Sequence, residues 1–174
     1  LGSSPDKNDG GNGGAVVITA GEAKGNNNAD SGGNIEMYGG KARAGQGGSL
    51  HIMSGYGEQT SSGAMALRTS NAGNEGVSGA IGISTGTSSA GNSGFVSIAT
   101  GDATGGKGGS INAVVGTGDT GSGGDIKMRA GATSALSTGG KIQLITGQGI
   151  QTTSGSLELL TANSGGSGVS GAIH

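Results

Sequence analysis

Gly94-Phe-Val-Ser-Ile-Ala-Thr-Gly101 and Gly109-Ser-Ile-Asn-Ala-Val-Val-Gly116 are the stretches that decide the fold. Each places two apolar residues two positions apart, as at Val96 and Ile98, and encloses them between glycines. Side chains two positions apart on an extended backbone lie on the same face. The pattern is therefore typical of a short strand with one buried face.

This motif, Gly-x-Φ-x-Φ with Φ aliphatic, recurs along the chain at intervals of 15 or 16 residues after one longer first interval. A fixed period in a Gly-rich chain indicates a repeat architecture rather than a disordered linker. The motif begins at Gly14, Gly33, Gly48, Gly63, Gly79, Gly94, Gly109, Gly124, Gly140, Gly155 and Gly171. We name its aliphatic members the aliphatic ladder and expect them to form the core: Val16, Ile18, Ile35, Met37, Leu50, Ile52, Met65, Leu67, Ile81, Ile83, Val96, Ile98, Ile111, Ile126, Met128, Ile142, Leu144, Leu157, Leu159 and Ile173.

The repeats predict an all-β fold in which each short strand stacks on the strand about 15 residues further along. Because every circuit would return the chain to the same edge in the same direction, the strands would be parallel. We therefore expect a single-domain parallel β-solenoid, or β-helix, of about eleven coils of 15–16 residues, uncapped at both ends. Residues 1–174 would form one continuous segment without an internal domain boundary.

Both ends of the sequence favour continuation of the repeat. Joined head to tail, His174 and Leu1 would form a junction at which Ile173 and Leu1 restore the spacing of the motif. Residues 59–82 also align without gaps to residues 151–174, which indicates duplication of a block of several repeats. We expect one unit of a longer tandem array or of an end-to-end stacked array of copies.

The composition argues against an enzyme. The chain has 44 Gly, no Cys and no Trp, and only 2% of its residues are aromatic, so the usual large side chains of a catalytic core are missing. A net charge of −2 argues against a nucleic-acid partner. No apolar run is long enough to span a membrane. We expect no catalytic residue, no cofactor-binding residue and no cofactor.

Residues that could bind a metal are scattered. His51 and His174 lie far apart in the sequence without a third nitrogen or thiolate ligand, so we expect no zinc site. Asp102, Asp119 and Asp125 lack the nine-residue period of calcium-binding repeats, which argues against a specific calcium site and leaves weak calcium binding open.

The polar residues lead to two further predictions. Asp125 and Lys141 occupy the same outward position in adjacent repeats, so we expect a weak ion pair between neighbouring strands. A partial column of threonines lies two places after the second aliphatic residue, either at the start of a turn or facing inward as a hydrogen-bonded ladder. It comprises Thr69, Thr85, Thr100, Thr146 and Thr161.

A resemblance to known repeat proteins is seen in two stretches, SGGNIEMYGGKARAGQGGSLHIMSG (31–55) and GDATGGKGGSINAVVGTGDTGSGGDIKMRAG (101–131). Their repeat pattern resembles that of the long Gly/Ser/Thr-rich repeat proteins of diatoms and related algae. The resemblance implies a secreted or cell-surface protein with a structural, adhesive or matrix role. It supplies no catalytic residue.

Together these patterns predict a structural component of an extracellular fibre or matrix. Its partners would be copies of itself placed end to end, with lateral fibre contacts or polysaccharide as further partners. Ile145 and Leu160, adjacent in one outward column, would suit such lateral contacts. The alternative is a discrete soluble rod that binds ice or polysaccharide along one wall. The varied outward residues, among them Glu36 and Lys127, argue against a regular ice-binding surface.

Overall fold

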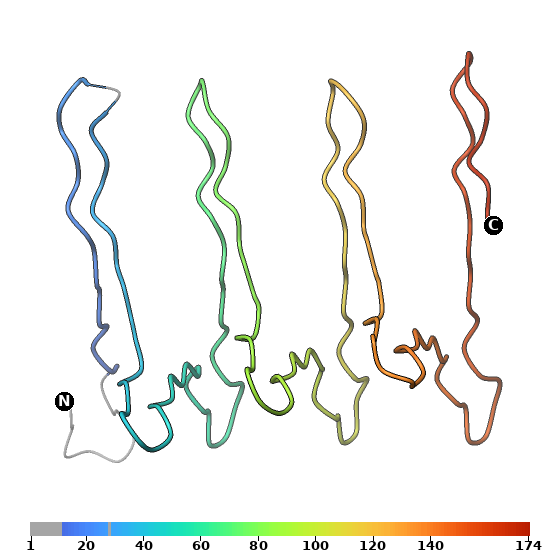
Figure 1. The fold of residues 1–174 in the computed structure, drawn as a ribbon, viewed down its shortest axis with the longest axis horizontal. Helices are drawn as coiled ribbons and strands as arrows, with labels where there is room; N and C mark the ends of the chain where they lie inside the picture. The colour runs from blue at the N-terminus through green and yellow to red at the C-terminus, as the bar shows by residue number, and fades with distance from the viewer. Residues whose placement is uncertain (1–11, 28) are drawn as a thin grey trace. The chain divides into compact units, whose positions relative to one another are not determined.

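The computed structural model describes residues 12–27 and 29–174. Figure 1 shows the chain running in open, extended segments joined by bends. The chain divides into two units, Leu1–Ser84 and Thr85–His174, and both are built from the same two alternating pieces. The described residues contain no helix, no strand and no sheet.

The predicted parallel β-solenoid, or β-helix, is therefore wrong. That fold needs each extended segment to exchange backbone hydrogen bonds with the segment about 15 residues further on. In the described part of the chain, eight backbone hydrogen bonds are present, and none joins two consecutive motifs in this way. A folded chain usually makes about one hydrogen bond per residue. The motif repeats as predicted in the sequence, but its segments do not stack on one another within the chain.

The first piece of each repeat is an arm, in which the chain leaves, bends and returns to a narrow base that we call the neck. Five necks are closed by a backbone hydrogen bond between glycines, such as the one that Gly48 N donates to Gly40 O at 2.8 Å. Five others bring a threonine or valine against the returning glycine, as Thr100 does with Gly109. We number the arms 1 to 10 in chain order: residues 20–33, 39–48, 54–63, 69–79, 85–94, 100–109, 115–124, 130–140, 146–155 and 161–171.

The tip of each arm is a bend, as at residues 43–45 in arm 2 and 104–106 in arm 6. Three tips contain a glycine with positive φ, namely Gly91, Gly105 and Gly121, at 108°, 75° and 74°. Side chains disfavour this region of backbone conformation, so glycine suits these three bends. The chain therefore reverses its direction at the tips.

The second piece is the link, a segment of five residues that joins one arm to the next. Each link carries the motif's Φ positions second and fourth, as Ile126 and Met128 do in residues 125–129. The links are residues 15–19, 34–38, 49–53, 64–68, 80–84, 95–99, 110–114, 125–129, 141–145 and 156–160. All variation in repeat length therefore falls in the arms.

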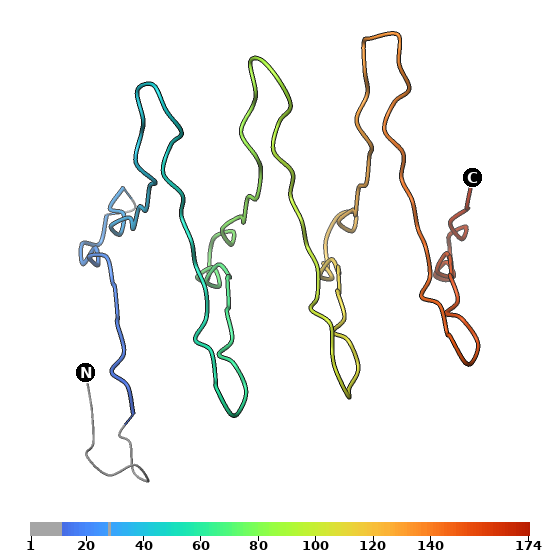
Figure 2. The ribbon, with the colours of Figure 1, turned by 90° about the horizontal axis from the view of Figure 1, so that it is seen from below.

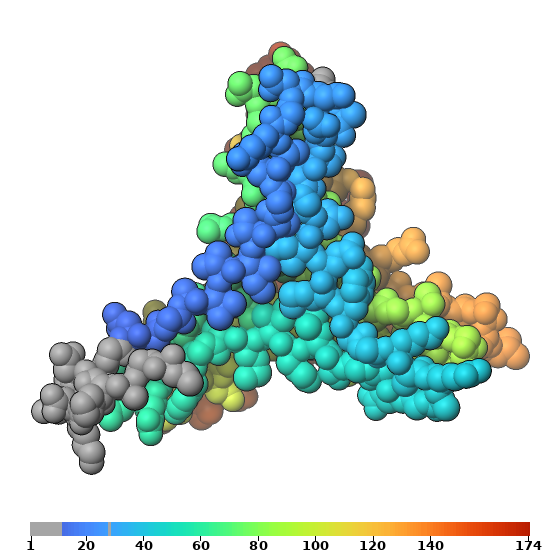
Figure 3. All heavy atoms as spheres, turned by 90° about the vertical axis from the view of Figure 1, so that its left-hand side faces the viewer, coloured from blue at the N-terminus to red at the C-terminus, as the bar shows by residue number. Residues whose placement is uncertain are grey.

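Successive arms point in different directions, and the direction returns at every third arm. In the first unit, arms 1 to 3 diverge (Figure 3), and arm 4 again points the way of arm 1 (Figure 1). In the second unit, arm 10 points the way of arm 7 in Figure 1. Arms 8 and 9 follow arms 5 and 6 in the same way in Figure 2. The chain within each unit thus winds with three arms to a turn.

Candidate functional surface

The aliphatic ladder lies on the links, except for Ile173 after the last arm, and is exposed to solvent throughout. No described residue of any type is buried. The exposed fraction of the ladder residues runs from 51% at Ile81 to 74% at Leu67, with Val16 higher at 89%. Within this chain alone the ladder therefore encloses no core.

The ladder is nevertheless distinct from the other large apolar side chains. Outside the ladder these expose 78% or more, as at Ile145, except Val115, which lies in the neck of arm 7 and exposes 42%. On the links the difference follows from the two-residue alternation of an extended segment, which places the ladder on one face and residues such as Val17 and Ile145 on the other. The ladder face is the partly sheltered one.

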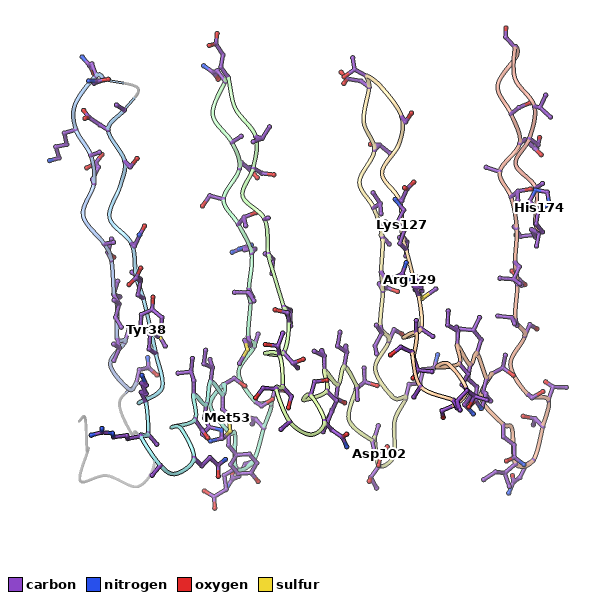
Figure 4. All side chains as sticks on the ribbon, in the orientation of Figure 1. Tyr38, Met53, Asp102, Lys127, Arg129 and His174 are labelled. Atoms are coloured by element: carbon purple, nitrogen blue, oxygen red, sulfur yellow. The ribbon has the colours of Figure 1, made fainter. Side chains whose placement is uncertain are left out.

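One ion pair shows this alternation directly. Lys127 Nζ lies 2.6 Å from Asp125 Oδ2, and both side chains are largely exposed. Figure 4 shows Lys127 and Arg129 along the same segment after arm 7. The sequence prediction that Asp125 pairs with Lys141 within the chain is wrong, because the two links are not hydrogen-bonded neighbours. Asp125 pairs instead with the residue two places further on.

The threonine column has a role that the sequence left open. A Cβ added at Gly109 would lie 3.1 Å from Thr100 Cγ2, and one added at Gly79 would lie 3.3 Å from Thr69 Cγ2. Thr100 Oγ1 also donates a 3.4 Å hydrogen bond to Gly109 O. These threonines therefore sit in the necks, opposite the first glycine of the next motif.

The necks are the feature that sequence reasoning missed. The neck position two places after the second Φ position is always small or β-branched: Ala20, Gly39, Ser54, Thr69, Thr85, Thr100, Val115, Ala130, Thr146 and Thr161. Its partner is the motif glycine nine or ten places later, or thirteen in the first arm. That pairing of columns was readable in the sequence, because a glycine opposite a small residue is typical of close backbone approach.

The remaining predicted residues are not brought together. His51 and His174 are exposed, and Figure 4 shows His174 on the last segment of the chain. No group of three metal-ligating side chains occurs among the residues that the structure describes. Leu1, the other half of the predicted junction, lies outside the described residues. In the described part, no helix has the length and apolarity that a membrane crossing needs.

The accessible area of the single chain is far larger than that of a compact monomer. The accessible surface is 17703 Å² for a chain of 16.2 kDa. A compact monomer of this mass exposes about 7,500 Å², and a fully unfolded chain about 23,500 Å². The chain thus exposes about 10,000 Å² more than a compact monomer would.

Comparisons with protein-family models, with curated proteins and with solved structures found no match to this chain.

Proposed function

We propose that the chain is a non-enzymatic structural component of an extracellular fibre or matrix, whose aliphatic ladder is a surface for assembly. The observation that carries the proposal is the exposure of the whole ladder, repeated on link after link at the same spacing. A periodic apolar surface of this extent is unstable in water unless partners cover it.

The composition supports a mechanical role over a chemical one. Small residues dominate the arms, only 11% of residues are charged, and the net charge is −2. Few like charges would therefore oppose close packing of many chains. The resemblance to the Gly/Ser/Thr-rich repeat proteins of diatoms and related algae agrees with a secreted, structural role.

The ice-binding alternative gains no support from the threonines. An ice-binding surface needs threonines presented together on a flat outward face, whereas Thr69 and Thr100 face glycines across the necks of their own arms. Contact between the polar arm tips and polysaccharide is compatible with a matrix role. Polysaccharide is therefore a further partner in the same proposal.

Electron cryo-microscopy of assembled material tests the proposed function. We expect long filaments with axial layers about 4.8 Å apart, the spacing of hydrogen-bonded extended segments. Short particles of uniform length that bind ice or polysaccharide would contradict the fibre and identify a binding module instead.

A further inference from the structure

We propose that three copies of this chain, parallel and wound about a common axis, assemble by placing each link against the next link of a neighbouring copy. The inference deepens the proposed function, on which it rests, by naming the partner that covers the aliphatic ladder. It is carried by the unpaired links, the exposed area and the directions of the arms.

The first step is the state of the backbone. Of the eight backbone hydrogen bonds among the described residues, five close necks, and three, such as Asp30 N to Asn27 O, lie within arms. The links donate and accept none. Extended segments with free N–H and C=O groups along both edges pair with further extended segments, because leaving those groups unpaired in an apolar assembly is costly.

The second step is the area that the partners must cover. About 10,000 Å² separates this chain from a compact monomer of its mass. Obligate interfaces bury 2,000–5,000 Å² or more in total. The excess is therefore larger than a single patch for one small partner, and it points to partners that follow the chain along its length.

The third step identifies the partner as the same chain. A partner must present aliphatic pairs at the ladder's own spacing, which is 15 or 16 residues after a longer first interval, over ten links. A second copy meets this condition at every link. It also presents extended segments whose backbone N–H and C=O groups are unpaired, so the two copies can hydrogen-bond to each other.

The fourth step sets the number of copies at three. Arm direction returns at every third arm within each unit (Figures 1 and 2), yet no backbone hydrogen bond joins arm 1 to arm 4 or arm 7 to arm 10. Two further copies, rotated about the common axis by one third and two thirds of a circle, would each place one arm between arm 1 and arm 4. The same holds between arm 7 and arm 10. Closed rotational symmetry of this kind is the rule for assemblies of identical chains.

The fifth step is the register, which the charges support. In this arrangement a residue of one copy faces the equivalent residue of the next repeat in its neighbour. Asp125 of one copy then faces Lys141 of the next, and Glu36 faces His51. No two like charges face each other at the first, third or fifth positions of neighbouring links. Charge complementarity thus favours an offset of one repeat between copies.

The mass of the 174-residue chain in solution is the first test. We expect sedimentation equilibrium to give three times the 16.2 kDa of one chain. A mass of one or two chains would overturn the inference.

Cross-linking tests the register. The chain has no cysteine, so introduced thiols are unique. Ser97→Cys with Asn112→Cys places thiols at the third positions of consecutive links, and a short bis-maleimide should join them into products of two and three chains on a denaturing gel. The control with Ser97→Cys alone should stay at the mass of one chain. If the double variant also stays at that mass, the inferred register is wrong.

The two proposals fail separately. Filaments built from a chain that is monomeric before assembly would retain the fibre and remove the three-chain arrangement. A three-chain particle that never elongates would retain the arrangement and remove the fibre.

Discussion

The necks and the links differ in what they need in order to be stable. A neck is completed within one chain by a glycine packed on a small residue, as with Gly33 and Ala20, and in five arms by a hydrogen bond as well. A link has an apolar face and no backbone partner inside the chain. The chain therefore forms its arms by local contacts, whereas its links would be completed only by other copies in the proposed assembly. Substitutions in the two regions should consequently have different readouts.

The largest effect is expected in a link. Ile126→Asp would place a carboxylate on the ladder face, where burial of an unpaired charge costs several kcal/mol. We expect association to weaken at least tenfold, measured by sedimentation over a dilution series. Lys127→Ala, on the opposite face of the same link, should associate like the unmodified chain. Equal association of the two variants would contradict the assignment of the ladder as the assembly surface.

A neck substitution should reduce stability with less effect on the specificity of association. A Cβ added at Gly48 would lie 2.9 Å from Gly40 N, so Gly48→Ala forces the neck of arm 2 apart. Steric insertion of this kind lowers the free energy of unfolding by about 1–3 kcal/mol. Chemical denaturation measures it. Gly45→Ala in the tip of the same arm meets nothing within 4 Å and serves as the control. Equal losses at both glycines would show that the necks carry no structural constraint.

The smallest effect is expected for the ion pair on the outer face of a link. Asp125→Asn removes the pairing with Lys127, whose side chain is 84% exposed. Exposed pairs contribute less than about 1 kcal/mol and weaken further as salt is added. Thermal unfolding in low and high salt should therefore show a small difference that disappears in high salt. A large loss that persists in high salt would place Asp125 in a buried contact.

How far sequence reasoning reached can be seen at particular residues. The spacing of pairs such as Val96 and Ile98 locates every link, because apolar residues two apart are readable without a structure. The step from links to a stacked single-chain fold failed, since periodicity states which residues are equivalent and not which molecule supplies the neighbour. The aliphatic ladder remains a predicted core that the single chain does not test.

The necks were within reach of the sequence but were not found. The Thr100 column and the Gly109 column are separately visible, and only their pairing nine places apart shows a close approach across an arm. Small apolar residues beyond the necks, such as Ala42 and Ala103, lie exposed in the arms.

The constant five-residue length of the links, set against arms of unequal length, bears on how such a protein can change. An insertion or deletion inside a link would shift the ladder to the opposite face, because side chains alternate. The same event at a tip leaves every link in phase, and arm 1, with its long stretch from Glu22 to Gly32, already contains one such extension. Tips are thus the sites where foreign peptides could be grafted, and where natural variants can acquire new recognition loops without loss of register.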